Sequence, residues 1–438
     1  MQAWTFRAEG FLSEIFVTLT GGAFLTGLAV ALGAGPVALA LLAALPFLAQ
    51  VGQLGAPILE QRLGGRRGFV VGLLTLARLL WLAPVALLLA GMRGEWAVSV
   101  AVGAVFVQAL FGMVAQNGWL AWVADLVPQA QQVTLFGHRA WAVALATLVA
   151  SPIGAVLLDA GRETGEEGPV LAGLLGVGIV AGVAGALTLR RLPDAAPAAR
   201  DRAAGVAVWR RLLQGREFRR VLVLFGAWYG AIGVSAPFWT LYMLNHLGWS
   251  FKLAILHTCI VLVIRLTCNG AWVRAIERVG SRKVLIATGF MLASNPVWWL
   301  VATRESSWPL WIEAVVSGVA WTGFNQAAFI QPMATLAPED RSRGLGMFHV
   351  VTGAILFAAS MLGGVFLNAA DEAGWAFLAV FGASAVLRVV TAITTLRLTE
   401  PGVSVRGFFV DFVGSGVLRR PAGRLGAFLW SRRGSGEP

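Results

Sequence analysis

The chain has 438 residues, of which 58% are hydrophobic and only 13% are charged. A water-soluble protein carries charge on about a quarter of its positions, so this composition excludes a soluble globular protein and indicates an integral membrane protein. The net charge of +12 comes from Lys and Arg that gather between the apolar stretches. Such a distribution orients a membrane protein, and we therefore expect no nucleic-acid partner.

Apolar stretches of about 20 residues recur along the whole chain, and a helix of that length crosses the hydrocarbon core of a bilayer. The stretches are too long and too uniformly apolar for barrel strands, so they are predicted to be helices. The first is expected to be retained, because no small-residue cleavage site follows it. In chain order, the twelve predicted spans are 9–33, 36–59, 68–91, 95–123, 136–160, 169–189, 220–244, 250–273, 283–303, 309–333, 344–368 and 374–396.

The spans fall into two six-helix units, 1–190 and 220–397. Between them, residues 191–219 are predicted to be a cytoplasmic linker whose second part, Val206 to Phe218, forms a helix in the membrane interface. Residues 398–438 form a basic amphipathic tail in which Phe and Trp alternate with Arg. Two interpretations of the tail stay open, binding to anionic membrane lipids and a merely solvated segment.

Lys and Arg concentrate in alternate loops and in both termini, while acids such as Glu163 and Glu166 mark the other side. This asymmetry predicts a multi-pass protein of the inner, or cytoplasmic, membrane with both termini in the cytoplasm. Cys259 and Cys268 lie in one predicted span and give neither a disulfide framework nor a metal-ligand spacing. No phosphate-binding loop or catalytic arrangement is present in the sequence, so we expect no cofactor, no metal and no enzymatic activity.

Short segments of the first unit recur in the second at a nearly constant separation, which predicts that a six-helix unit is duplicated in parallel orientation. Residues 61–67 read Gln-Arg-Leu-Gly-Gly-Arg-Arg, and residues 277–283 read Glu-Arg-Val-Gly-Ser-Arg-Lys. Each copy is a basic turn between two predicted spans. The other matching pairs are Leu126–Pro128 with Leu336–Pro338, and Ser151–Asp159 with Ser360–Asn368.

With these basic turns and twelve spans, the chain resembles the major facilitator superfamily of transporters. That family carries a Gly-x-x-x-Asp-Arg-x-Gly-x-Arg-Arg/Lys pattern between its second and third helices and commonly echoes it between the eighth and ninth. The resemblance covers all twelve spans and implies an all-α membrane fold of two pseudo-symmetric six-helix bundles. The matching residues are Gln61, Arg62, Gly64, Arg66 and Arg67 in the first turn, and Glu277, Arg278, Gly280, Arg282 and Lys283 in the second.

In the family these turns form a cytoplasmic gate that stabilises the outward-open state. The physical reasons are visible here, because glycine permits a tight reversal and the cationic side chains can bond open helix carbonyls. The alternative is that the arginines only determine topology. Gln61 stands where the family has Asp, whereas Glu277 supplies the acid of the second turn. We therefore expect the second turn to act more strongly than the first.

Polar and charged residues inside spans are costly in hydrocarbon and are site candidates for that reason. Arg265 is the foremost one, because its guanidinium could hold an anionic group with two hydrogen bonds. The alternative is an internal charge pair with Glu14. The remaining amides could instead be interhelical hydrogen-bond contacts. The predicted substrate-binding residues are Arg265, Asn117, Asn325, Gln326, Gln116 and His257.

Glu14 is interpreted as the one deep carboxylate and so as the candidate for proton or ion coupling, with capping or orienting of the first helix as the alternative. Arg78 and Arg388 lie in mid-span on helices that are peripheral in the family. We explain these two mid-span charges only by internal pairing or by snorkelling of the side chain toward the membrane surface.

The sequence thus predicts a monomeric secondary transporter that moves a small, unidentified solute by alternating access, a rocker-switch motion about a site between the two bundles. Two other classes stay open. One is a facilitator or a transporter of lipid or amphiphile. The other is a membrane sensor on the same fold that does not transport.

Overall fold

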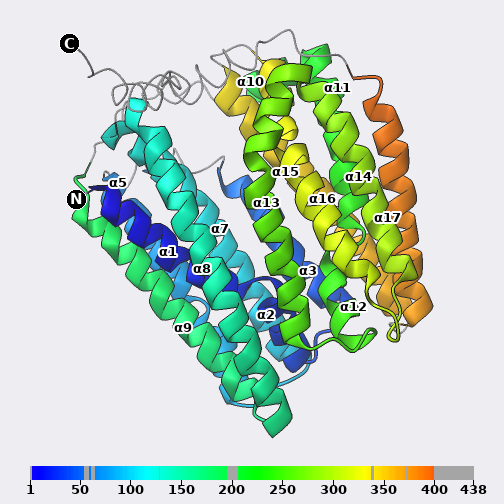
Figure 1. Cartoon of the computed structure of the whole chain (residues 1–438). Helices are drawn as coiled ribbons and strands as arrows, with labels where there is room; N and C mark the ends of the chain where they lie inside the picture. The colour runs from blue at the N-terminus through cyan, green and yellow to red at the C-terminus, as the bar shows by residue number, and fades with distance from the viewer. Residues whose placement is uncertain are drawn as a thin grey trace, which may run out of the picture.

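The structure is a computed structural model that describes residues 2–53, 59–60, 65–127, 129–194, 206–336, 340–370 and 373–398, and every regular element in these ranges is a helix (Figure 1). The first half contains α1 (Gln2–Thr20), α2 (Gly22–Ala31), α3 (Pro36–Leu48), η1 (Ala49–Val51), α5 (Arg66–Leu79), α6 (Leu82–Leu89), α7 (Glu95–Leu126), α8 (Gln129–Thr164), α9 (Glu167–Thr188) and η2 (Leu189–Arg191). The second half contains α10 (Val206–Gln214), α11 (Arg216–Gly233), η3 (Ala236–Phe238), α12 (Trp239–Asn245), α13 (Phe251–Val279), α14 (Ser281–Val301), α15 (Pro309–Ala334), α16 (Arg341–Ala369) and α17 (Gly374–Thr395).

The predicted helices are confirmed, with ends that differ by a few residues and with breaks that hydropathy does not reveal. The first span begins at Gln2 rather than at residue 9 and is interrupted between α1 and α2, where Gly22 has a φ of +51°. The seventh is interrupted by the 3-10 turn η3, which contains Pro237. Proline lacks the N–H that a continuous α-helix would use, so a break there is expected.

Ten segments of the described residues are long and apolar enough to cross a membrane, judged by length and composition. Of the predicted second span, the apolar helix described covers Pro36–Val51, and residues 54–58 lie outside the described residues. The predicted tenth span, α15, is long but carries Glu313, Asn325 and Gln326 among its apolar residues. The chain is a multi-pass membrane protein whose α15 carries polar groups into the bundle.

The helices form two bundles with matching internal packing. In the first bundle α1 packs on α8 and α9, and in the second α11 packs on α16 and α17. Between the bundles, α3 packs along α16 and α8 packs along α13. In Figure 1 the two groups diverge toward the end where α1 begins and α10 lies, and they converge where α2 and α12 lie. We name these the open end and the closed end.

The hydrophobic core explains this shape. At the closed end one cluster joins both bundles, with Phe24 and Leu158 from the first and Phe238 and Phe251 from the second. Toward the open end each bundle has a core of its own, one around Trp122 in the first bundle and another among second-bundle side chains. Burial of apolar surface therefore holds the bundles together at one end only.

The repeated segment at the ends of α8 and α16 occupies equivalent places in the two bundles. A Cβ on Gly154 would lie 2.6 Å from the ring of Phe24, and a Cβ on Gly363 would lie 2.2 Å from the carbonyl oxygen of Val234. Both glycines thus let the fifth or eleventh predicted span approach the first or seventh closely. The geometry agrees with the duplication that the sequence predicts.

The interfacial helix expected over Val206 to Phe218 is shorter, because α10 ends at Gln214 and Phe218 belongs to the buried face of α11. Arg211 of α10 donates two hydrogen bonds from Nη2 to the carboxylate of Asp340, at 2.6 and 2.8 Å. Leu212 is buried in the core of the second bundle. The part of the linker that contains α10 is therefore attached to the second bundle, while the tail beyond Leu398 lies outside the described residues.

Candidate functional site

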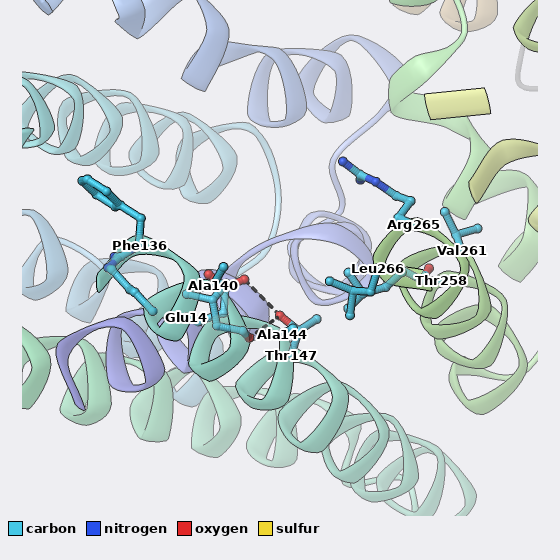
Figure 2. A pocket seen from close by; sticks show the side chains of 12 residues that line it. Glu14, Phe136, Ala140, Ala144, Thr147, Thr258, Val261, Arg265 and Leu266 are labelled. Carbon is cyan, nitrogen blue, oxygen red and sulfur yellow. Dashed lines mark hydrogen bonds between the residues drawn. The ribbon is translucent and has the colours of Figure 1, made fainter. Parts of the chain in front are cut away.

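A cavity of about 540 Å³ lies between the two bundles, with α1 and α8 on one wall and α13 on the other. We name it the central cavity. Figure 2 shows Arg265 pointing into the space between the bundles, with Glu14 and Thr147 on the facing wall. The lining residues are Glu14, Phe136, Arg139, Ala140, Val143, Ala144, Thr147, Thr258, Val261, Leu262, Arg265 and Leu266.

Glu14 is half-buried on the cavity-facing side of α1. Its Oε1 accepts a hydrogen bond of 3.1 Å from the Thr147 hydroxyl of α8, and this is its one hydrogen bond within the described residues. A carboxylate has about four acceptor positions, so most of its hydrogen-bonding capacity faces the cavity. The capping role considered from the sequence is not seen, because Glu14 lies in the middle of α1.

Arg265 occupies the opposite wall, on α13, and its side chain is accessible from the cavity. Within the described residues the guanidinium has no hydrogen-bond or ion-pair partner, and so the internal pair with Glu14 is not formed in this conformation. The Thr322 hydroxyl of α15 contacts the backbone carbonyl of Arg265 at 3.4 Å, which ties the neighbouring helix to α13 at this level. The cation is therefore positioned but not neutralised.

Arg139, the other cation in the cavity wall, forms an ion pair with Glu9 of α1. Its Nε donates to Oε2 of Glu9 at 3.0 Å, and its Nη2 donates to Oε1 of the same carboxylate at 3.3 Å. Ser13 donates a further hydrogen bond to Glu9, and the Arg139 guanidinium lies 4.8 Å from the Trp119 ring centroid. The pair fixes α8 against α1 and leaves Arg139 little charge to offer to a ligand.

A second cavity, of about 460 Å³, lies inside the first bundle and shares Glu14 and Arg139 with the central cavity. Arg78 lines it with a side chain that is only 6% exposed and an Nε that has no hydrogen-bond partner. The Arg78 guanidinium lies 5.0 Å from the ring centroid of Phe16. Snorkelling, one of the two accounts offered from the sequence, is wrong for this residue because the side chain stays inside the bundle.

A third cavity, of about 310 Å³, lies inside the second bundle and shares Thr258 and Val261 with the central cavity. His257 Nε2 and Glu313 Oε2 are 2.8 Å apart there, and both side chains are buried. Arg388 lines the same cavity, is 3% exposed, and donates from Nη1 to the carbonyl of Leu292 at 3.2 Å. Snorkelling is wrong for Arg388 as well.

Glu9 and Glu313 correct the interpretation that Glu14 is the one deep carboxylate. Both are almost fully buried, at 3% and 5% exposure, and each bonds a basic side chain from another helix. Glu313 lies inside the predicted span 309–333, so an acid within an apolar stretch was the available signal. Glu9 lies at the predicted start of the first span, where hydropathy cannot separate an interfacial acid from a buried one.

The remaining predicted binding residues are dispersed. Gln116 lines the cavity inside the first bundle, while Asn117 is half-buried and lines none of the three cavities. Gln326 donates from Nε2 to Oδ1 of Asn269 at 2.6 Å, which is the interhelical contact held as the alternative from the sequence. Asn325 is exposed beside it and lines none of these cavities.

In the first basic turn, Gln61, Arg62 and Gly64 lie outside the described residues. The described part of the turn is well anchored. Arg66 is 2% exposed and forms an ion pair with Glu60, and the backbone N–H of Arg67 donates to Oδ1 of Asp194 at 2.9 Å. Two acids that the sequence pattern does not contain, Glu60 and Asp194, thus bond the turn.

In the second turn Gly280 has a φ of +89° and links α13 to α14, as the predicted tight reversal requires. Arg282 donates from Nη2 to the carbonyl of Leu396, at the end of α17, at 2.7 Å. The cation thus bonds an open helix carbonyl, which is the contact expected from the chemistry of the turn. Glu277, Arg278 and Lys283 are exposed.

At the closed end, Asp159 of α8 caps the first turn of α13. Its Oδ1 accepts from the backbone N–H of Phe251 at 2.8 Å, and its Oδ2 accepts from that of Lys252 at 2.9 Å. The equivalent residue of the repeat, Asn368 of α16, lies next to Gly35, where α3 begins. Two equivalent side chains therefore meet helix N-termini of the opposite bundle.

No protein-family model matches the chain, and a search of curated proteins gives no match. Solved structures do resemble it, and the three described next are 13–14% identical to it in sequence. A crystal structure of a point mutant of the nucleoside transporter NupG superposes with a TM-score of 0.72 at 14% identity and covers 91% of this chain and 100% of that one.

A bacterial homologue of the human lysosomal transporter Spinster, in an inward-facing and occupied conformation, gives a TM-score of 0.65 at 13% identity over 91% of this chain and 96% of that one. A D-xylose-proton symporter gives 0.64 at 14% identity over 91% and 97%. At such identities the likeness concerns the fold. The chain has the major facilitator fold, in agreement with the prediction from its sequence.

Proposed function

We propose that this protein is a secondary transporter that moves a small solute by alternating access. The observation that carries the proposal is the central cavity, which lies between two bundles whose shared hydrophobic core is confined to the closed end. Alternating access needs a site between two bodies that separate at one end at a time. The fold neighbours are transporters and not enzymes, which supports the same conclusion.

The two moving bodies in this proposal are residues 1–190 and 220–397, joined by the linker 191–219. If both termini lie in the cytoplasm, as the charge distribution predicts, the cavity opens inward and the structure is the inward-open state. The basic turns lie at that same open end, where they would act as the cytoplasmic gate. Because α10 is fastened to the second bundle, the part of the linker before it would connect the two bodies.

The solute is not identified by the fold. By their names, the neighbours include transporters of nucleosides and of D-xylose, and one is a bacterial metal transporter. Within the described residues, no group of three or more His, Cys, Asp and Glu side chains is arranged to hold a metal ion. Proton coupling stays a hypothesis, with Glu14, Glu9 and Glu313 as carboxylates that line the three cavities.

Of the alternatives, the central cavity supports a transporter over a sensor, because a sensor without transport has no need of a solvent-accessible space between the bundles. A facilitator would use the same cavity without coupling. A lipid or amphiphile carrier is compatible with the apolar side chains of α8 and α13, and it would be recognised by lipid that co-purifies with the protein. Neither alternative changes the motion that is proposed.

The motion can be measured with two spin-label pairs after Cys259 and Cys268 are replaced by Ala. Gly137→Cys with Gly270→Cys reports the open end, and Leu157→Cys with Leu253→Cys reports the closed end, since all four positions are exposed on α8 and α13. In lipid nanodiscs we expect two distance populations at each end that change in opposite directions with pH or added solute. A single, invariant distance at both ends under every condition would contradict alternating access.

A further inference from the structure

The central cavity presents an acid and a base on facing walls, and within the described residues neither of the two forms an ion pair. Glu14 lies on the wall of the first bundle and Arg265 on that of the second (Figure 2). We propose that the cavity binds a zwitterionic solute, with its ammonium group at Glu14 and its acidic group at Arg265. The inference rests on the proposed transport function, because it names the class of solute that the same cavity would carry.

The availability of Glu14 follows from its surroundings. The nearest cation on its own wall is Arg139, whose guanidinium donates two hydrogen bonds to Glu9 instead. The Thr147 hydroxyl bonds Oε1 of Glu14 and orients the carboxylate without neutralising it. Glu14 is therefore an oriented carboxylate with open acceptor positions, which is the arrangement that an ammonium group requires.

The availability of Arg265 follows in the same way. Thr258, Val261 and Leu262 are its neighbours in the cavity on α13, and none of them carries a charge. A guanidinium offers five N–H donors in a planar fork that fits a carboxylate with two parallel hydrogen bonds. Holding such a group without a partner in a membrane protein is costly, and binding of an acid offsets that cost.

The side chains that line the cavity between the two charges indicate the chemistry of the ligand segment that joins its amine to its acid. Apart from the hydroxyls of Thr147 and Thr258 and the guanidinium of Arg139, which is paired with Glu9, this lining consists of apolar side chains such as Val143, Ala144 and Leu266. In this open conformation the two charges stand on opposite walls of a cavity of about 540 Å³, whereas a compact α-amino acid places its own two charges side by side. We therefore infer a solute whose amine and acid are separated by an apolar segment, such as an ω-amino acid or a small dipeptide.

The two charges also give selectivity against solutes with a single charge. When the bundles close around a ligand, water leaves the cavity and each unpaired charge loses its solvation. An anion would pair with Arg265 but leave Glu14 unpaired, and a cation would do the reverse. A zwitterion pairs with both, so it permits closure without an uncompensated charge.

The competing account is that Glu14 and Arg265 pair directly when the empty cavity closes. Both accounts explain why the charges are present, but they differ in what the cavity binds. A direct pair requires no ligand, and ligands would then have to break it. The proposal instead predicts that ligand binding depends on both residues and on the separation of the ligand's two charges.

The experiment measures thermal stabilisation and calorimetric affinity of the purified full chain for the series from 3-aminopropanoate to 8-aminooctanoate. An optimum at one chain length is expected. For that length, the N-acetyl derivative keeps only the acid and the methyl ester keeps only the amine. The variants are Glu14→Gln and Arg265→Gln, with Arg274→Gln as a matched control, because Arg274 is an exposed arginine of α13 outside the three cavities.

We expect each variant to weaken binding of the zwitterion and of only one of the two singly charged analogues. Glu14→Gln weakens binding of the zwitterion and of its ester by about tenfold or more, since one charge-assisted hydrogen bond is lost, but it does not weaken the N-acetyl compound. Arg265→Gln weakens the zwitterion and the N-acetyl compound but does not weaken the ester. If Arg265→Gln does not fold, Arg265→Lys keeps the charge without the fork and is expected to weaken the same two ligands less.

Two results would overturn the inference. One is that no zwitterion of any length, nor a dipeptide such as glycylglycine, binds better than its singly charged analogues. The other is equal loss of all three ligands in both variants, which would show that neither residue contacts one particular end of the ligand. Either result would leave the proposed transport function intact if the spin-label distances at the two ends still change in opposite directions.

Discussion

Asp159 of α8 accepts a hydrogen bond from the backbone N–H of Phe251, the first residue of α13, at 2.8 Å, and so links the two bundles at their closed end. Its second oxygen accepts from the next amide, that of Lys252. A carboxylate at a helix N-terminus meets unpaired N–H groups and the positive end of the helix dipole. Asp159 is 6% exposed, so this contact is protected from water.

This contact must break if the closed end opens. We predict that Asp159→Asn weakens it by about 1 kcal/mol, which shifts the equilibrium toward opening at that end by roughly fivefold. The spin-label pair at Leu157 and Leu253 measures the shift directly. Glu163→Gln is the control, because Glu163 is an exposed acid in the next turn of α8. An equal shift in both variants would mean that overall charge, not the cap, holds this end closed.

The basic turns give a prediction that reverses the expectation from the sequence pattern. Glu60 is 4% exposed and forms an ion pair with the buried Arg66, whereas Glu277 is exposed. Removing one partner of a buried pair leaves the other charge uncompensated and costs about 3–5 kcal/mol, whereas an exposed acid contributes about 1 kcal/mol or less. We therefore predict that Glu60→Gln lowers thermal stability strongly and that Glu277→Gln hardly changes it.

The measurement is the unfolding temperature of the two variants in the same detergent, followed by the distances between spin labels at the open end. Arg66→Met tests the pair from its other side and should resemble Glu60→Gln. Larger effects from Glu277→Gln in both measurements would restore the original expectation that the second turn acts more strongly.

The fold could be predicted from this single sequence because its signals are local. Stretches of apolar residues define spans, and segments such as Ser151–Asp159 recur with their glycine and terminal polar residue in place. Each of these signals is a property of neighbouring residues in the chain. The breaks at Gly22 and Pro237 were harder to predict, since a membrane helix tolerates both residues when its neighbours satisfy the freed backbone groups.

The site was predictable only in part, for a physical reason. Arg265 and Glu14 stand out because each is a charge in an apolar stretch, and the structure places both in one cavity. What neutralises a charge is decided by helix packing. Arg139 pairs with Glu9 from a distant segment, and His257 bonds Glu313 on another helix. Neither contact can be predicted from the sequence. Predicting which charges stay free requires knowing which are paired.

The repeated glycines predict an asymmetric response to a single methyl group. At Gly363 a Cβ would lie 2.2 Å from the backbone carbonyl oxygen of Val234. A backbone atom cannot move away by a change of rotamer, as a side chain can. At Gly154 a Cβ would meet the Phe24 ring at 2.6 Å, and a side chain can rotate at some cost. We predict that Gly363→Ala destabilises the protein by about 3 kcal/mol or more and Gly154→Ala by about 1–3 kcal/mol.

Gly173→Ala is the matched control, because a Cβ there has no atom within 4 Å. Alanine is favoured over glycine in a helix by up to about 1 kcal/mol, so this variant should be neutral or slightly stabilised. Unfolding temperatures in detergent compare all three variants. If Gly363→Ala is as stable as the control, the close approach of α16 to the break between α11 and α12 is not needed.

The cluster in the second bundle predicts strong coupling between two residues. Glu313 bonds His257 and lines the same cavity as Arg388, which is buried and whose Nε has no hydrogen-bond partner within the described residues. Glu313→Gln therefore leaves the Arg388 cation without its counter-charge and is predicted to cost about 3–5 kcal/mol. Arg388→Met leaves an unbalanced carboxylate and is predicted to cost a similar amount.

The double variant removes both charges together, and so it should cost clearly less than the two single changes combined, by about 1–3 kcal/mol. Unfolding free energies from denaturant titration of the four proteins in one detergent measure this coupling. Additive losses would show that the two charges do not compensate each other. In that case Arg388 would have to be held by the Leu292 carbonyl and by water in the cavity, and Glu313 by His257 alone.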